Sequence, residues 1–265
     1  MLPESVAAYR LVIFASVLVV MMVVESVWPR RARSETRRAR WPGNIMLTVI
    51  NAVVLRLIEP LSAIAAAILA VEKGWGLLPR LGLADWQLVL VTILLFDLLI
   101  YGQHRLSHLL KPAWRLHRVH HADHDLDATT GIRFHPIEII MSMLIKAGGV
   151  LLLGPSPLAV LSFEVLLNAS ALFNHSNLRL PRQIERPLRW LIVTPEMHEI
   201  HHSEVRTESD KNYGFFLSCW DRLFGTYQET PQQGIDGLKI GLDGTRNKPT
   251  STLGFLLGSP IREKP

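Results

Sequence analysis

The chain has 265 residues, of which 49% are apolar and 19% are charged, and its formal net charge is +5. Its single cysteine, Cys219, excludes an intrachain disulfide and any Cys₄ zinc or iron–sulfur site built from this chain alone. The apolar residues lie in long blocks. This distribution excludes intrinsic disorder and argues against a simple soluble domain.

The first apolar block, residues 11–24, contains no charge, proline or glycine and has Tyr9 and Trp28 at its two ends. With these flanks it is long enough to span a bilayer, which takes about 20 residues. A signal peptide fits less well, because the basic cluster follows the apolar stretch instead of preceding it. We therefore interpret this block as the first transmembrane span.

Six arginines follow the first block within eleven residues. Short loops rich in Lys and Arg remain in the cytoplasm, so the run predicts a cytoplasmic loop that would also suit an anionic lipid surface. Binding to nucleic acid is disfavoured because the run lies between two spans. The six are Arg30, Arg31, Arg33, Arg37, Arg38 and Arg40.

The remaining blocks predict three or four further spans. Residues 44–71 are apolar but interrupted at Pro60, and they form either one kinked span or a re-entrant hairpin. Residues 86–110 follow a predicted N-cap at Asp85, and residues 137–153 and 158–173 form a hairpin. The sequence thus predicts an all-α integral membrane protein with four to five transmembrane helices. Residues 104–136 and 174–228 then lie together as a helical cap on the cytosolic side.

Eight of the 11 histidines fall in three short windows. Offsets of three and four place the rings of each window on one face of a helix. Pro112 and the pair Thr194-Pro195 mark the helix starts that precede the second and third windows. The windows are His104 with His108; His117 with His120 and His121; and His198 with His201 and His202.

So many buried imidazoles need partners, and a metal supplies what nearby acceptors do not. Eight nitrogen ligands exceed one tetrahedral ion and match two ions that share a site. Zinc carries out no redox chemistry, whereas iron with an open position activates O₂, which is what the C–H bonds of a buried lipid require. The windows therefore favour a di-iron oxygenase.

Asp97 lies in an apolar span on the helical face that continues toward His104. An ionisable residue there is costly without a partner. Two roles stay open for it: it accepts a hydrogen bond from a ligand imidazole and fixes the tautomer of that ring, or it forms a structural bond to another helix.

Two other classes of function remain as alternatives. The segment His198-Glu199-Ile200-His201-His202 also satisfies HExxH, the motif of zinc metalloproteases, which would make the chain an intramembrane protease with Glu199 as general base. That chemistry leaves six clustered histidines idle. A non-enzymatic metal-binding or transport protein would instead place its ligands near the bilayer midplane.

These residues resemble the fatty acid hydroxylase/sterol desaturase superfamily of membrane di-iron enzymes. The family pattern is HxxxH, about eight residues, HxxHH and a distant HxxHH, and here eight residues separate His108 from His117. Further stretches of residues 97–228 look like bacterial members of the family. They are Arg133-Phe134-His135-Pro136, Phe173-Asn174-His175-Ser176-Asn177, Thr194-Pro195-Glu196-Met197-His198, Asn212-Tyr213-Gly214 and Trp220-Asp221-Arg222-Leu223-Phe224-Gly225-Thr226.

The resemblance implies two non-haem irons held by the eight histidines, with His175 as a ninth ligand. It also implies hydroxylation or desaturation of a lipid, of sterol or fatty-acyl type, with O₂ and external electrons. No cysteine set, nucleotide loop or haem domain is evident, so a cytochrome b5- or ferredoxin-type reductase system would supply the electrons. The implied location is a bacterial inner membrane with the histidines facing the cytoplasm.

The division of the chain follows from these assignments. Residues 1–85 carry the N-terminal helices and basic loop, and residues 86–228 the catalytic domain. Residues 229–265 form a tail, in which a loop is followed by a short apolar stretch, Leu253 to Leu257, expected on the membrane surface. His135 and Asn212 are expected near the ligands, Asn212 and Tyr213 as organisers of the cap and Gly214 as a turn. His124 is expected in a solvated loop and Cys219 in the interior, and Trp220, Leu223 and Phe224 as a packing cluster.

Changing Glu199 to Gln distinguishes the two enzyme classes. A protease loses its general base and all peptide hydrolysis, whereas a di-iron oxygenase largely keeps its activity. The measurement is lipid oxidation and peptide cleavage by the same purified variant. Loss of peptide cleavage with the metal retained would contradict the oxygenase interpretation.

Overall fold

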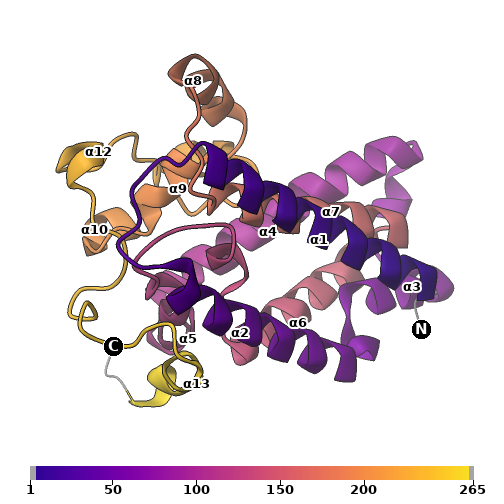
Figure 1. Ribbon diagram of the computed structural model, residues 1–265. Helices are drawn as coiled ribbons and strands as arrows, with labels where there is room; N and C mark the ends of the chain where they lie inside the picture. The colour runs from indigo at the N-terminus through magenta and orange to yellow at the C-terminus, as the bar shows by residue number, and fades with distance from the viewer. Residues whose placement is uncertain (1–3, 263–265) are drawn as a thin grey trace.

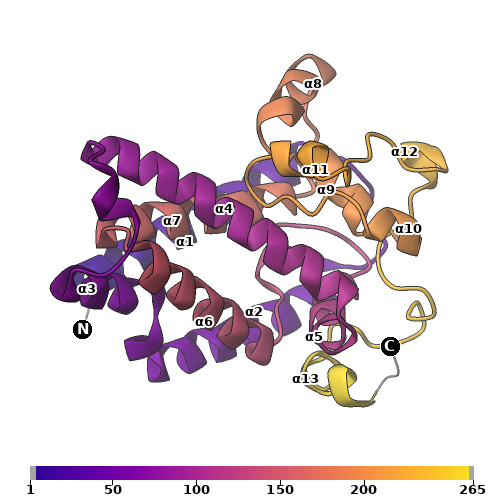
Figure 2. The same ribbon diagram turned by 180° about the vertical axis from the view of Figure 1, so that it is seen from behind.

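The computed structural model describes residues 4–262, and these residues form helices joined by loops, with no β-sheet among them (Figure 1, and from behind in Figure 2). Three of the helices, η1 to η3, are short 3₁₀ turns. The elements in chain order are α1 Glu4–Val27, α2 Arg37–Leu57, η1 Glu59–Leu61, α3 Ala63–Lys73, η2 Leu78–Leu81, α4 Asp85–Leu109, α5 Lys111–His121, η3 Thr130–Ile132, α6 Pro136–Leu153, α7 Pro157–Asn174, α8 Arg182–Leu191, α9 Pro195–His201, α10 Arg206–Ser209, α11 Cys219–Leu223, α12 Gly234–Gly237 and α13 Leu253–Arg262.

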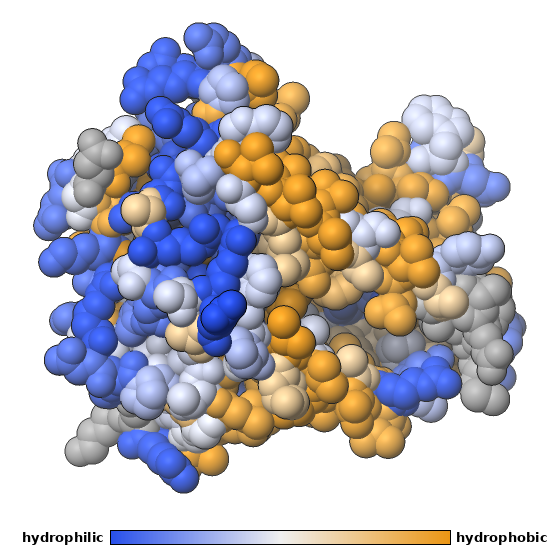
Figure 3. All heavy atoms as spheres, in the orientation of Figure 1, coloured by the Kyte–Doolittle hydropathy of each residue, from blue (hydrophilic) through white to orange (hydrophobic). Residues whose placement is uncertain are grey.

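Four helices within the described residues are long and apolar enough to cross a membrane: Ala8–Val27 of α1, and all of α4, α6 and α7. Hydrophobic residues cover the part of the surface over α1 and α2, and hydrophilic residues gather over the opposite end, where α9 and α10 lie (Figure 3). The chain is therefore a multi-pass membrane protein with a polar cap. The predicted all-α membrane fold is confirmed.

The interrupted block at residues 44–71 is not one continuous helix. A 3₁₀ turn containing Pro60 separates α2 from α3, and neither helix is among the four candidate spans. With 11 residues, α3 is about 16 Å long, which is half of a bilayer's hydrocarbon thickness. It packs against α6 and α7, where Ile64 joins a core with Phe96 of α4 and Phe163 of α7. The number of candidate spans thus lies at the lower end of the predicted range.

The basic segment between α1 and α2 is a structural strap and not a solvated loop. Arg30 donates to Glu196 (Nη1–Oε2, 2.5 Å) and to Glu199 (Nε–Oε2, 2.6 Å), which joins the segment to α9. The backbone N–H of Arg31 donates to the Asn177 side chain (2.9 Å). Five of the six arginines take part in ion pairs, so the run binds the spans to the cap. The five are Arg30, Arg31, Arg33, Arg37 and Arg40.

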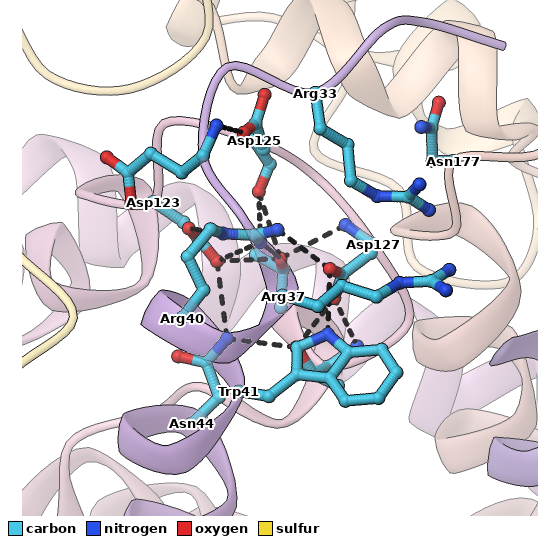
Figure 4. A network of polar contacts seen from close by, with 12 residues as sticks. Arg33, Arg37, Arg40, Trp41, Asn44, Asp123, Asp125, Asp127 and Asn177 are labelled. Carbon is cyan, nitrogen blue, oxygen red and sulfur yellow. Dashed lines mark hydrogen bonds and ion pairs between the residues drawn. The ribbon is translucent and has the colours of Figure 1, made fainter. Parts of the chain in front are cut away.

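Arg40 is completely buried and is the centre of a polar network (Figure 4). It donates from Nε and Nη2 to Asp123 (2.7 and 2.8 Å) and from Nη1 to Asp127 (2.7 Å). Burial alone would raise the pKa of Asp123, but Arg40 and Arg133 outweigh it and hold that pKa well below the usual range. The loop after α5 is thereby fixed to the start of α2.

The tail is better ordered than a loop. Its helix α13 packs against α5 and α2, where Leu256 is buried with Leu47 and Val119. Gly43 of α2 lies so close to the Ser251 carbonyl that any Cβ there would overlap it. The tail therefore belongs to the cap as far as residue 262, and residues 263–265 of the predicted tail lie outside the described residues.

Arg40→Ala should destabilise the protein by about 3–5 kcal/mol, because it leaves buried Asp127 without its ion pair and buried Asp123 with only the more distant Arg133 (3.7 Å). Arg38→Ala is the matched control: Arg38 is exposed in the same segment, and its loss should change stability by no more than about 0.5 kcal/mol. Chemical unfolding in detergent micelles measures both. Equal stabilities for the two variants would contradict the role assigned to Arg40.

Candidate metal centre

Nine histidine side chains meet inside the cap, in two adjoining groups. Within each group one potential ligand atom per residue lies within 4.8 Å of every other. None of these nine histidines is more than 4% exposed. The larger group contains His104, His108, His117, His121 and His201, and the smaller group contains His120, His175, His198 and His202.

The ends of four helices bring these rings together. His104 and His108 occupy the last turns of α4, and His175 is the C-cap of α7. Each HxxHH window serves both groups. On α5, His120 faces the smaller group while its neighbours His117 and His121 face the larger one. On α9 the arrangement is reversed, with His201 in the larger group and His198 and His202 in the smaller. The two groups are thereby held side by side.

The predicted helix starts are confirmed for both windows. Pro112 lies in the first turn of α5, and the Thr194 side chain accepts a hydrogen bond from the Met197 N–H (3.3 Å) ahead of Pro195 at the start of α9. The chain turns into α9 at a defined residue, so the register of its three histidines toward the centre is fixed.

Ring nitrogens within each group approach one another as ligands of one ion do. In the larger group Nε2 of His117 lies 3.1 Å from Nε2 of His104 and 3.2 Å from Nε2 of His121. In the smaller group Nε2 of His175 lies 2.9 Å from Nε2 of both His120 and His198. Two nitrogens at right angles on a metal, each about 2.1 Å from it, are about 3 Å apart. The donor sets therefore fit a metal ion in each group.

Seven ring nitrogens are shielded from solvent and have no hydrogen-bond partner among the described residues. An unpaired buried acceptor or donor costs free energy comparable to a lost hydrogen bond. A metal ion bound between the rings would supply the missing partner for nitrogens that face it. The seven are His108 Nε2, His120 Nδ1, His121 Nδ1, His198 Nδ1, His201 Nε2, and both Nδ1 and Nε2 of His202.

Backbone carbonyls set the orientation of three rings. Nδ1 of His104 donates to the Tyr213 carbonyl, Nδ1 of His201 to the Lys211 carbonyl and Nδ1 of His175 to the Ala171 carbonyl, each at 2.7 Å. A carbonyl oxygen only accepts, so Nδ1 carries the proton and the Nε2 lone pair is free toward the group. The backbone thus fixes the tautomer that a metal ligand needs.

Carboxylates hold two further rings. Oε1 of Glu138, in the first turn of α6, accepts from His117 Nδ1 at 2.6 Å, and Oδ1 of Asp210 lies 3.2 Å from His108 Nδ1. The sequence does not predict either carboxylate as a partner of a histidine ring. Pro136 marks the first turn of α6, but no local spacing connects Glu138 with His117, which is 21 positions away.

Burial keeps five of these imidazoles neutral. It lowers the pKa of His120, His121, His198 and His202 well below the ordinary value, and repulsion by neighbouring rings lowers it further. Burial also lowers the pKa of His175 to about 4. Neutral rings are the form that binds metal, so the centre is ready for ligation at neutral pH.

Asp97 is not a partner of a ligand imidazole. Its carboxylate accepts from the Phe216 N–H (3.2 Å), the Leu217 N–H (3.0 Å) and Trp220 Nε1 (2.8 Å). Of its two predicted roles, the structural one is correct: its partners are Trp220 of the short helix α11 and the backbone of the loop before that helix. This bond ties α4 to the cap.

His135 and Asn212 also act on the backbone. Nδ1 of His135 accepts from the Ile137 N–H (3.2 Å) and caps α6, and His135 lies outside both histidine groups. Asn212, at a φ of 53°, donates to the carbonyls of Met197 (3.0 Å) and Gln228 (2.9 Å). Asn212 therefore organises the cap around α9, as the sequence predicts.

Several expectations near the site were wrong. His124 is buried between Glu35 (2.7 Å) and Thr245 (3.0 Å), because the tail covers the loop that carries it. Cys219 is exposed. Leu223 and Phe224 are also exposed, so the cluster buried around Trp220 contains neither of them, although Phe224 stacks on the Tyr101 ring. A helix of five residues is too short for its hydrophobic periodicity to predict which side the cap covers.

Gly214 serves close packing rather than a turn. A Cβ at this position would lie 2.9 Å from Asp221 Oδ2 and 2.9 Å from Val193 Cγ2. Asp221 accepts the N–H groups of Tyr213 (2.7 Å) and Gly214 (2.8 Å), and this close approach holds Tyr213 over the histidines.

Glu199 is engaged away from the histidine rings. Its carboxylate binds Arg30 and also Arg31 (Oε1 to Nε, 3.3 Å) at the strap. The two HExxH histidines, His198 and His202, share their group with His120 and His175, and five more rings adjoin it. A single zinc site with Glu199 as base does not describe this arrangement.

The fold and the centre define a class: a multi-pass membrane protein whose polar cap encloses two clusters of histidines. The sequence profile of the fatty acid hydroxylase family matches residues 89–226, more than half of the chain. The chain belongs to the fatty acid hydroxylase family. No solved structure matches it.

Relatives of known function share about 30% of the aligned residues. Ornithine lipid hydroxylase OlsE of Rhizobium tropici is 31% identical over 179 residues, which cover 66% of this chain and 51% of OlsE. Human alkylglycerol monooxygenase is 30% identical over 142 residues, 52% of this chain and 30% of that protein. Rat cholesterol 25-hydroxylase is 29% identical over 146 residues, which cover 54% of this chain and 47% of that protein. The chain spans about half or less of the length of these relatives.

Glu138→Ala should weaken metal affinity by about 10- to 100-fold, because it removes the carboxylate that orients His117. Glu35→Ala is the matched control, since it removes an equally close carboxylate from a buried histidine, His124, outside both groups. Metal retention against increasing chelator concentrations measures both. Equal retention by the two variants would contradict the role of Glu138.

Proposed function

We propose that this protein is a membrane-bound non-haem di-iron oxygenase that hydroxylates a lipid with O₂ and external electrons. The observation that carries the proposal is the pair of adjoining histidine groups, which fits two metal ions. Family membership and the lipid hydroxylases and monooxygenases among the relatives support it. Their names favour hydroxylation over the desaturation that the sequence left open.

Iron is the metal that the chemistry requires. Imidazole nitrogens suit iron as well as zinc, but zinc carries out no redox reaction. When bound, two irons would supply the activation of O₂ needed to break an unactivated C–H bond. All nine histidines would hold them: five around one ion and four around the other.

The chain's own residues keep this centre dry and in register. Phe134 stacks on the His120 ring (centroids 4.4 Å apart), and Phe215 packs against the His104 ring (5.3 Å). These apolar walls exclude water, which strengthens electrostatic interactions inside and suppresses side reactions. Tyr213, held over the His104, His108 and His201 rings, closes the remaining side.

A lipid chain would reach the centre from the bilayer. A cavity of about 190 Å³ opens between α7 and the segment after α8, and Phe216 in its wall directly follows Phe215. Its lining is apolar apart from Ser170, as an acyl or sterol chain requires. The lining residues are Ala169, Ser170, Phe173, Ile192, Val193 and Phe216.

The remaining assignments belong to the same proposal. Residues 86–228 form the catalytic domain, and a cytochrome b5- or ferredoxin-type reductase system delivers the electrons. The centre faces the cytoplasm from a bacterial inner membrane, which agrees with the arginine-rich segment on its side. The substrate is a lipid of a class that lipid analysis would identify.

His120→Ala and His201→Ala each remove one ligand, from the smaller and the larger group respectively. Both variants should lose iron and show no detectable turnover. His124→Ala, outside both groups, should keep both irons. The measurements are iron content after anaerobic purification and the gain of one oxygen in one lipid class of the host. Full turnover by His120→Ala with its iron retained would contradict the proposal.

A further inference from the structure

Two arginines share one carboxylate at the end of the first span. Glu25, near the C-terminus of α1, is completely buried, and its Oε1 lies 3.1 Å from Arg37 Nη2 and 3.7 Å from Arg33 Nη2. Its Oε2 accepts the backbone N–H groups of Ala128 and Asn177, both at 3.0 Å. Glu25 is therefore shared by two guanidinium groups and two backbone N–H groups, and its single negative charge balances only one of the two arginines.

The neighbouring carboxylate is also occupied. Asp127 accepts from Arg40 Nη1 (2.7 Å), Trp41 Nε1 (3.1 Å) and Thr129 (2.9 Å from its N–H). No ion pair joins Asp127 to Arg33 or Arg37 among the interactions of the described residues. Asp127 therefore does not balance the excess positive charge of Arg33 and Arg37.

Three nitrogens of the two arginines lack an acceptor. Arg33 Nε, Arg33 Nη2 and Arg37 Nε are shielded from solvent and make no hydrogen bond. The two guanidinium groups extend in the same direction from the strap and from α2, toward the side where Asn177 lies (Figure 4). Their side chains as a whole are 22% and 27% exposed, so both arginines lie at the protein surface although these three nitrogens do not contact solvent. Donors arranged in this way are completed by an anion with several acceptor oxygens.

The location selects the anion. Glu25 is two residues from the end of the span Ala8–Val27, and Arg37 is the first residue of α2. Trp28, three residues after Glu25, is exposed, and exposed tryptophans are enriched at membrane–water boundaries. Arg37 lies over the Trp41 ring at 4.8 Å. The group that a membrane presents at this level is the phosphate of a lipid, and guanidinium forks match phosphate oxygens in pairs.

We propose that Arg33 and Arg37 form a binding site for the phosphate of a phospholipid headgroup, held in place by Glu25. The site is independent of the oxygenase chemistry. It is nevertheless close to the centre, since Asn177, whose N–H binds Glu25, is two residues after His175. A phospholipid bound here would fill the surface between α1 and α2 beside the histidine groups.

The test uses the double variant Arg33→Lys/Arg37→Lys, which keeps both charges and the pairing with Glu25 but removes the planar forks. Arg38→Lys, at an exposed position of the same segment, is the matched control. Binding of phosphatidylglycerol to the full-length protein in detergent micelles is measured by native mass spectrometry. Diacylglycerol with the same acyl chains serves as the ligand without phosphate.

The parent and Arg38→Lys should bind phosphatidylglycerol at least about tenfold more tightly than diacylglycerol, and the double variant should lose that preference. Inorganic phosphate is then added as a competitor. If the site binds free phosphate, the added phosphate displaces the lipid; if the site binds a lipid-borne phosphate, the lipid stays bound. Equal binding of the two lipids by the parent, or an unchanged preference in the double variant, would overturn the proposal. If the double variant unfolds, the single variant Arg33→Lys is measured against the same two outcomes.

Discussion

Nine imidazoles shielded from water within one cap set the constraint on which the structure depends. Each ring must be neutral, oriented and completed by a partner, because an unpaired buried nitrogen costs free energy. Carbonyls and carboxylates outside the groups satisfy part of the need, at Tyr213 and Glu138 for example, while other ring nitrogens lack any partner from the chain. The unpartnered ring nitrogens therefore favour the binding of a metal ion. They lie where the ends of α4, α5, α7 and α9 meet.

The arginine-rich segment connects this centre to the membrane helices. Its composition predicts a cytoplasmic loop, and in the structure it is a strap whose side chains reach Glu25 of α1, Asp123 beside α5 and Glu199 on α9. The run of arginines thus holds the spans and the cap together. This cohesion explains why Glu199 occurs inside an HxxHH window: it binds the strap on the side of α9 away from the rings.

Local spacing was enough to predict the spans and the meeting of the histidine windows. Offsets of three and four fix a helical face, and apolar blocks fix the spans, so neither depends on distant residues. What failed depends on contacts between remote segments. The bond between Asp97 and Trp220, the burial of His124 under the tail and the bond between Glu138 and His117 join residues that no local pattern relates.

Anomalous X-ray scattering at the iron edge, from crystals of anaerobically purified protein, tests the account most directly. The account predicts two iron peaks, one enclosed by the five rings of the larger group and the other by the four rings of the smaller group. A single peak, or zinc at either position, would contradict it.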